Sequence, residues 1–221
     1  MARQTDTNAA RTPLSKERVL RAAIALADAD GLEALSMRRL AKELGVEAMS
    51  LYNHVANKDE ILAGIIDAVA TEIDLPSDEG DWKTAMRRSA ISARDVLLRH
   101  RWASSLWMTR QSGGLARMRH GDWMLRMLRE AGLSDDLSYH AFHILEAYIL
   151  GFTYLHLSVP HKGEDLAGMA ATFLQEVPAD EYPDFVEHVM QHLEPDHGDE
   201  GGFEVGLDLI LDGLERLRDT R

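Results

Sequence analysis

The amino-acid sequence predicts an all-α protein built from a small N-terminal part and a larger C-terminal part. From Leu14 to Arg221 the apolar residues recur at the 3.6-residue spacing of amphipathic helices, and no alternating strand pattern of more than a few residues competes. A length of 221 residues with 45% hydrophobic and 28% charged residues is enough for a packed core. The polar stretch from Leu75 to Asp81 is the best candidate for a linker between the two parts.

Composition excludes several classes of protein. The chain has no cysteine, which rules out disulfide scaffolds, thiolate zinc sites and cysteine nucleophiles. The first 13 residues are polar, and no apolar run approaches the roughly 20 residues that cross a bilayer, so we expect a cytoplasmic protein with no membrane partner.

The net charge of -13, with a pI near 5.2, argues at first against a nucleic-acid partner. Its distribution removes that argument. The first 60 residues hold nine basic and nine acidic side chains, so the whole acidic excess lies beyond them. A neutral N-terminal part predicts weak generic attraction to DNA, with specific contacts supplying much of the affinity.

Start and stop signals mark four helices in the N-terminal part. Ser15 and Ser36 are suitable N-caps, and Gly31 and Gly45 are suitable ends. The run from Asn57 to Glu60 has the N-cap and the acidic N3 residue of a capping box. The helices are expected at Lys16–Asp30, within Leu35–Leu44, at Glu47–His54 and at Asp59 to about Asp74, closed by Pro76.

Seven further helices, connected by short loops, are expected in the C-terminal part. They lie at about Trp82–Arg99, Trp102–Arg110, Leu115–Ala131, Asp135–Ser158, Asp165–Glu176, Tyr182–Leu193 and Gly202–Arg218, with a loop from Glu194 to Gly202. The predicted organisation is an N-terminal arm over residues 1–13, a helix-turn-helix domain with a connecting helix over 14–75, and a larger domain over 76–221.

The two short helices around Gly45 match the helix-turn-helix plan, in which the second helix enters the major groove of DNA. An ordinary pair of short helices would have the same turn spacing. The chemistry of the outward face favours DNA, because Tyr52 followed by His54 on a short exposed helix has no packing explanation, and with Lys58 these side chains can anchor phosphates. The outward set suited to base edges and phosphates is Arg38, Ala48, Met49, Ser50, Tyr52, Asn53 and His54.

The run from Leu35 to Leu62, LSMRRLAKELGVEAMSLYNHVANKDEIL, resembles the DNA-binding signature of the TetR family of bacterial transcription regulators. The resemblance implies that operator DNA is contacted by Arg38, Ser50, Tyr52, His54 and Lys58, with Ala48 and Met49 at base-reading positions. Because these last two residues are apolar, thymine methyl groups are plausible targets.

The likeness continues into the C-terminal part, through Trp82, the run from Leu97 to Arg101, Gly151 and the run from Gly206 to Glu215. These residues resemble the effector-binding and dimerisation domain of the tetracycline repressor subgroup. The resemblance implies a homodimer joined through the long helix and the last helix. Independently, the last helix carries an apolar stripe broad enough for both an internal core and a partner helix, with Gly206 and Gly213 spaced for close approach. The predicted dimerisation residues are Ile149, Phe152, Phe203, Leu207, Ile210, Leu211, Leu214 and Leu217.

The same resemblance implies an effector site in the C-terminal part, but the residues at its positions differ from those of the subgroup. In the subgroup a histidine grips the magnesium chelate of tetracycline, and the matching position holds Trp107, whose indole cannot coordinate Mg²⁺. Core packing explains any one of the site residues, and only their joint position indicates a pocket. The predicted effector-binding residues are Ser89, Trp107, Met108, Arg110, Met118, Trp123, Met127, Tyr139, Phe142, His143 and Glu146.

Ten histidines raise a second hypothesis, a helical metal-binding or di-iron protein. His188 and His192 are one helical turn apart with His197 after them, and His140 and His143 lie near Glu146. A di-iron site needs two Glu-x-x-His motifs on facing helices, and only Glu194-x-x-His197 exists. A helical sensor that does not bind DNA is a third hypothesis. The sequence favours a ligand-responsive repressor with no cofactor, no catalytic residue and three partners: operator DNA, a small-molecule effector and a second copy of the chain.

Overall fold

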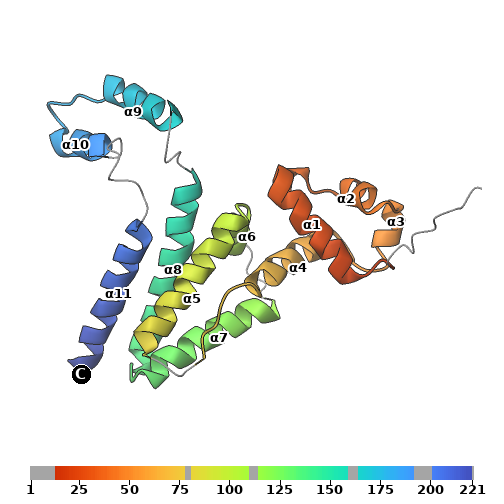
Figure 1. The fold of residues 1–221 in the computed structure, drawn as a ribbon, viewed down its shortest axis with the longest axis horizontal. Helices are drawn as coiled ribbons and strands as arrows, with labels where there is room; N and C mark the ends of the chain where they lie inside the picture. The colour runs from red at the N-terminus through yellow and green to blue at the C-terminus, as the bar shows by residue number, and fades with distance from the viewer. Residues whose placement is uncertain (1–12, 78–80, 110–113, 159–163, 192–200, 221) are drawn as a thin grey trace, which may run out of the picture.

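The computed structural model describes residues 13–77, 81–109, 114–158, 164–191 and 201–220, and every regular element within these ranges is helical (Figure 1). The predicted all-α class is confirmed. The elements are α1 (Lys16–Asp30), the 3₁₀ turn η1 (Leu32–Ala34), α2 (Met37–Leu44), α3 (Ala48–Leu51), α4 (Lys58–Ala70), α5 (Trp82–Arg99), α6 (Ala103–Thr109), α7 (Leu115–Glu130), α8 (Asp135–Ser158), α9 (Glu164–Glu176), α10 (Pro183–Gln191) and α11 (Gly202–Asp219).

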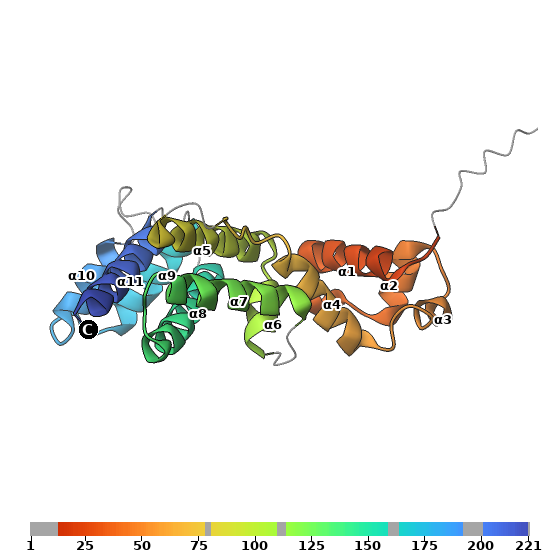
Figure 2. The same cartoon turned by 90° about the horizontal axis from the view of Figure 1, so that it is seen from below.

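The helices α1 to α4 form a unit at one end of an elongated molecule (Figure 2). Its starts and stops follow the sequence signals. The Ser15 hydroxyl accepts a hydrogen bond from the Arg18 amide at 3.2 Å, and Gly45 ends α2 in the left-handed region with φ of 66°. Leu40 and Leu51 are fully buried, so the two short helices share one core with α1 and α4.

Two helices in this unit are shorter than predicted. The Ala48–Leu51 helix has a single turn, and residues 52–54 continue it as a turn in which the His54 amide donates to the Leu51 carbonyl at 2.9 Å. The next helix stops at Ala70 and not near Asp74, because the amides of residues 71–73 donate to carbonyls three residues back, which tightens the chain into turns. The Thr71 hydroxyl adds a hydrogen bond to the Ala68 carbonyl at 2.6 Å.

The larger unit is built around α5 and α8, with α6 and α7 on one side and α11 on the other (Figures 1 and 2). Its core is continuous with that of the smaller unit through α4, which touches α5, α6 and α7. The pair α9 and α10 lies apart from this body, and its two helices pack on each other through Phe173 and Phe185, whose ring centroids are 5.5 Å apart.

A row of ion pairs joins α5 to α11. Basic side chains spaced along α5 meet acidic side chains spaced along α11 in antiparallel order. The Lys83 ammonium has two carboxylate partners, and hydrogen bonds from it to both raise its pKa above its ordinary value. Some of the acidic side chains of the C-terminal part therefore hold the last helix, α11, against α5. The pairs are Lys83 with Asp212 (2.5 Å) and Glu215 (2.9 Å), Arg87 with Asp208 (2.8 Å), and Arg94 with Glu204 (2.8 Å).

A buried histidine connects the two units. His100, at the end of α5, has its Nδ1 atom 2.8 Å from Oδ1 of Asp28 on α1 and its Nε2 atom 3.3 Å from Oε1 of Glu72 just after α4. The Trp102 indole N–H donates to the same Asp28 oxygen at 2.7 Å. This polar cluster ties the first helix to the larger unit.

Candidate functional site

The outward face of α2 and α3 carries apolar and polar side chains that are exposed and do not pack into the core. Met49 is 75% exposed and Tyr52 is 47% exposed, although both are large side chains. Arg38, Asn53 and Lys58 are also exposed. Exposed Met and Tyr side chains beside hydrogen-bonding groups suit contact with base edges and phosphates.

The basic residues of this unit divide into paired and free groups. Lys16 pairs with Glu60 at 2.5 Å, and Arg39 pairs with Asp30. Arg38 and Lys58 have no acidic partner among the described residues, so their charges remain available for an external anion. Lys58 is also the first residue of α4, where backbone N–H groups and the helix dipole favour a phosphate.

The capping box of α4 holds this helix start in place. The Asn57 side chain accepts from the Glu60 amide at 2.8 Å, and the Glu60 carboxylate accepts from the Ala56 amide at 2.6 Å, one residue before the position that a capping box usually uses. This bond from Ala56 is the largest cause that lowers the Glu60 pKa, followed by the hydrogen bond from Lys16. The local geometry next to Lys58 is therefore fixed before any DNA is present.

Three of the predicted DNA contacts are less exposed than expected. Ser50 and His54 are half-buried, and Ala48 packs part of its surface against the core. Ala48 was predicted to face outward, and its methyl group instead helps to hold the one-turn α3 on the domain.

A crevice between α5, α6, α7 and α8 contains the second candidate site. It has a narrow inner hollow of about 20 Å³ and an outer cleft of about 370 Å³. Trp107, His120 and Glu146 line both spaces. The inner hollow has room for a single water molecule at most, so a larger ligand would have to widen it.

Trp107 and His120 bring polar groups to the inner hollow, and Arg117 lines the outer cleft beside it. The Trp107 indole N–H is buried and makes no hydrogen bond among the described residues. Burial alone lowers the pKa of His120 to about 4, so this imidazole is neutral at pH 7. The Arg117 guanidinium lies 4.6 Å above the Trp107 ring, and burial lowers its pKa although the carboxylates of Glu146 and Asp67 act in the opposite direction. The crevice thus offers ring faces, a neutral imidazole and a cation to one small molecule.

The structure brings together only some of the predicted effector residues. Trp107, Met118, Phe142 and Glu146 line the outer cleft. The others are buried in the core, with Ser89, Trp123 and Met127 each less than 5% exposed, or lie on the surface away from both spaces, as do Met108, Tyr139 and His143. Arg110 lies outside the described residues.

Sequence reasoning missed His120 and Arg117, although a signal for His120 existed. It occupies the buried stripe of α7 with Ala116, Trp123 and Met127, so the helical period places it inward. For Arg117 no pattern separates it from an ordinary surface arginine. Its role follows from the position of Trp107, which belongs to another helix.

Asp67 of α4 caps the start of α7. Its Oδ1 atom accepts from the Ala116 amide at 2.8 Å and the Arg117 amide at 3.3 Å, whereas Gly114 at the N-cap offers no side chain. Contact is so close that a Cβ atom on Gly114 would lie 2.0 Å from the Asp67 carboxyl carbon. The helix that carries Arg117 and His120 is therefore joined directly to the helix that begins at Lys58.

The predicted dimerisation residues also separate into two groups. Ile149, Phe203, Leu207, Leu211 and Leu214 are buried in the chain's own core, so in this conformation they support the helices and do not face outward. Phe152 and Ile210 are half-buried, and Leu217 is exposed. Of the two glycines, Gly206 faces the Tyr148 hydroxyl within the chain, and Gly213 faces open space. Large apolar residues that do face outward on the same two helices are Ile144, Tyr154, Leu155, Val205 and Leu209.

The described residues contain no cluster of three or more His, Asp or Glu side chains that could hold a metal ion. His192, His197 and Glu194, which the metal hypothesis used, lie outside the described ranges. None of the described helices combines the length and the hydropathy that crossing a membrane requires.

Comparison with known proteins identifies the family. The family model described as bacterial regulatory proteins of the tetR family matches residues 19–65, and the model described as the C-terminal domain of tetracyclin repressor-like proteins matches residues 75–218. The transcriptional repressor DrrR1 of Streptomyces coeruleorubidus is 35% identical over 217 residues, covering 92% of this chain and 78% of DrrR1. The class C tetracycline repressor of Escherichia coli is 29% identical, with 94% of this chain and 93% of the repressor covered. The crystal structure of ActR from Streptomyces coelicolor with actinorhodin has a TM-score of 0.79 and 31% identity, and the match covers 94% of this chain and 99% of ActR. The chain therefore belongs to the TetR family of bacterial transcription regulators, with a C-terminal domain of the tetracycline repressor type.

Proposed function

We propose that this chain is a homodimeric repressor that holds a palindromic operator and releases it when a small organic molecule enters the crevice of the larger domain. The observation that carries the proposal is the outward face of α2 and α3 beside the start of α4. Arg38 and Lys58 have no acidic partner there among the residues that the structure describes, and Met49 and Tyr52 are exposed without a packing reason. In the proposed division, residues 1–13 form an arm, residues 14–75 read the DNA, and residues 76–221 bind the effector and the second copy.

Within the reading face we assign different roles to the side chains. Arg38, Tyr52, His54 and Lys58 would contact phosphates and fix the register. Met49, with the exposed part of Ala48, would touch thymine methyl groups, and Ser50 and Asn53 would supply hydrogen bonds at base edges or phosphates.

Dimerisation follows from the geometry of DNA. One helix-turn-helix makes a small interface, and two of them about 34–36 Å apart read successive major grooves. The apolar residues left outward on α8 and α11 supply a surface for the partner, including Leu155 (65% exposed) and Leu209 (66% exposed). Gly213 allows a partner helix to approach closely.

The crevice and its link to α4 support release by an effector. A ligand larger than water must widen the inner hollow, which displaces the walls that Trp107 and His120 form. Arg117 and His120 lie on α7, whose first amides bond to Asp67 of α4. A shift of α7 would therefore move α4 and with it the spacing of the two reading heads, so that the operator favours the state without ligand. Binding of actinorhodin by ActR supports an organic molecule as the ligand.

We also propose that the protein is cytoplasmic, carries no cofactor and has no catalytic role. The support is its family, whose members act by binding DNA.

The proposal is tested by selecting bound sequences from random DNA and then measuring the affinity of the selected operator. Tyr52→Ala and Lys58→Ala are expected to abolish specific binding. For Lys58→Ala the salt dependence at lower salt is a milder test, because each lost contact between a cationic side chain and a phosphate lowers the magnitude of the slope of log K against log salt by about 1, or about 2 for the dimer.

Tyr182→Ala is the matched control. Tyr182 is exposed to a similar extent, 54% against 47% for Tyr52, but it lies just before α10. It should bind the operator as the unaltered protein does. Unchanged affinity in both Tyr52→Ala and Lys58→Ala and an unchanged salt slope in Lys58→Ala, with an intact dimer, would refute the proposed reading face.

A further inference from the structure

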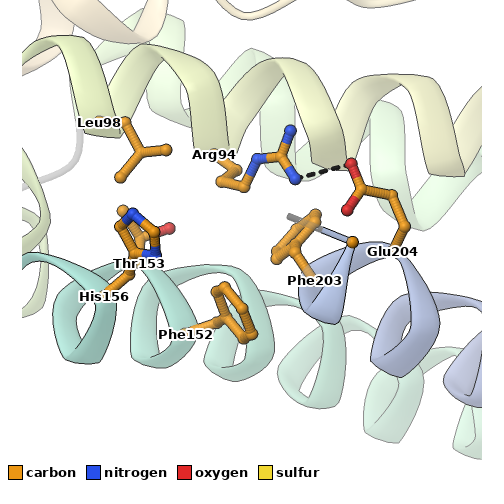
Figure 3. Close-up of a pocket in the computed structure, with 8 residues that line it drawn as sticks. Arg94, Leu98, Phe152, Thr153, His156, Phe203 and Glu204 are labelled. Carbon is orange, nitrogen blue, oxygen red and sulfur yellow. Dashed lines mark hydrogen bonds and ion pairs between the residues drawn. The ribbon is translucent and has the colours of Figure 1, made fainter. Parts of the chain in front are cut away.

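A second hollow lies between α5, α8 and the start of α11 (Figure 3). Its volume is about 400 Å³, within the range that small-molecule sites occupy. It shares no lining residue with the effector crevice. Its lining comes from three helices: Arg94 and Leu98 of α5, Phe152, Thr153 and His156 of α8, and Gly201, Phe203 and Glu204 at the start of α11.

Aromatic rings make one wall of this second hollow. The rings of Phe152 and Phe203 meet edge to face with centroids 5.3 Å apart, and the His156 ring lies nearly parallel to Phe152 at 6.4 Å. Phe203 is fully buried, whereas Phe152 is half-buried and points into the space between the helices (Figure 3). A flat apolar group therefore has a ring to pack on beside Leu98.

The charges around the second hollow select the sign of a ligand. The Arg94 guanidinium lies between two carboxylates, Glu204 at 2.8 Å and Asp95 at 2.9 Å, and 4.8 Å above the Phe203 ring. The charge of Arg94 is therefore already balanced by carboxylates, which disfavours a further anion such as a carboxylate or phosphate. Arg87 also lowers the pKa of Glu204 through space, and it is paired with Asp208.

One carboxylate oxygen of Glu204 accepts no hydrogen bond from another described residue. Its Oε1 atom accepts from Arg94, while its Oε2 atom is buried and has no hydrogen-bond partner among the described residues. Partial burial alone would raise the pKa of Glu204. Hydrogen bonds from Arg94 and from its own backbone amide outweigh burial, together with the charges of Arg94 and Arg87, and lower the pKa, so the carboxylate is ionised at pH 7. Because no other described residue donates to Oε2, a donor supplied by a ligand would stabilise this buried oxygen.

We infer that this second hollow binds an organic amine, a compound whose protonated amino group donates to Oε2 of Glu204 while a flat apolar ring packs on Phe152 and Leu98. A neutral ring compound would leave this oxygen without a charged donor, and an anionic one would meet the Glu204 carboxylate. The inference does not depend on operator binding or on the ligand of the crevice.

Three matched probes test the inference on the full-length protein by ¹⁹F NMR titration: 4-(trifluoromethyl)benzylamine, the corresponding benzyl alcohol and the corresponding benzoate. The amine is expected to bind at least about tenfold more tightly than the alcohol, and the benzoate more weakly still. Glu204→Gln should remove the preference for the amine, with the same tenfold loss. Leu98→Trp should fill the space and block the amine without touching the ion pair.

Glu146→Gln is the matched control, because it neutralises a carboxylate of the effector crevice and leaves Glu204 intact. Amine binding should survive it. Loss of amine binding in Glu146→Gln but not in Glu204→Gln would place the amine in the crevice and overturn the inference. Equal affinity for amine and alcohol would also overturn it, and so would the absence of amine binding at millimolar concentration.

Discussion

Replacing Asp67 with Ala isolates the contact that joins the reading domain to the effector crevice. Asp67 is the cap of a 16-residue helix on another part of the chain, and it accepts two amides, from Ala116 and Arg117. Loss of a capping side chain costs about 1 kcal/mol, and loss of a negative charge at a helix N-terminus costs about 0.3–1 kcal/mol. We therefore expect Asp67→Ala to lower the free energy of unfolding by about 1–2 kcal/mol, which is about 3–6 °C in melting temperature for a chain of this size.

Thermal unfolding followed by circular dichroism, at one fixed protein concentration, gives the size of this effect. Hydrogen exchange gives its location, because the amides of Ala116 and Arg117 should lose protection first. Asp67→Asn keeps an oxygen acceptor and should lose only the part due to charge, about 0.5 kcal/mol. Gly114→Ala should reproduce the loss, since a Cβ atom there displaces the Asp67 carboxyl group.

Asp122→Ala, an exposed carboxylate in the middle of the same helix, is the control and should change little. The capping argument fails if Asp67→Asn is as destabilised as Asp67→Ala, or if exchange of the α7 amides does not change in Asp67→Ala.

Three further predictions concern other parts of the chain. Burial lowers the pKa of His120 from 6.5 to about 4, so as the pH falls the unfolded state takes up this proton before the folded state does. The free energy of unfolding should therefore fall between pH 6.5 and 4, by up to about 3 kcal/mol. In denaturant titrations, His120→Gln should remove this part of the pH dependence. Gly45→Ala forces an L side chain to φ of 66° with nothing nearby to clash, so it should cost about 1–2 kcal/mol, and Gly45→Asn less; a neutral Gly45→Ala would contradict the strain argument. Leu209→Arg should convert the dimer to monomer in sedimentation experiments, whereas Leu115→Arg, at a residue 77% exposed on α7, should not; a dimeric Leu209→Arg would remove α11 from the interface.

Most of the helices could be predicted because their signals are local. Ser15 and Ser36 cap the helices they were expected to cap, and the predicted bounds of α5 and α8 are those of the structure. The misjudged ends are at α3 and α4, where hydrogen bonds that compete with the helix, such as that of Thr71, decide the last turn.

The candidate sites were less predictable because they depend on contacts between helices. The sequence pattern identifies the buried stripe of α11 correctly but cannot say whether the stripe meets the same chain or a partner. The structure places Phe203, Leu207, Leu211 and Leu214 inside, and Val205 and Leu209 are the exposed apolar residues of this helix that we propose for a partner. In the same way Trp107 could be foreseen as a wall, whereas Arg117 above its ring depends on how α6 meets α7.

The ion pairs between α5 and α11 have a consequence for how operator binding is measured. Salt weakens contacts with phosphates, and it also screens the pairs that Lys83 and Arg87 make with α11, the helix that we propose carries part of the dimer surface. At protein concentrations near the dimer dissociation constant, added salt would then dissociate subunits as well as DNA. A salt titration under those conditions would overcount the phosphates contacted, and only titrations well above that concentration would report on the DNA interface alone.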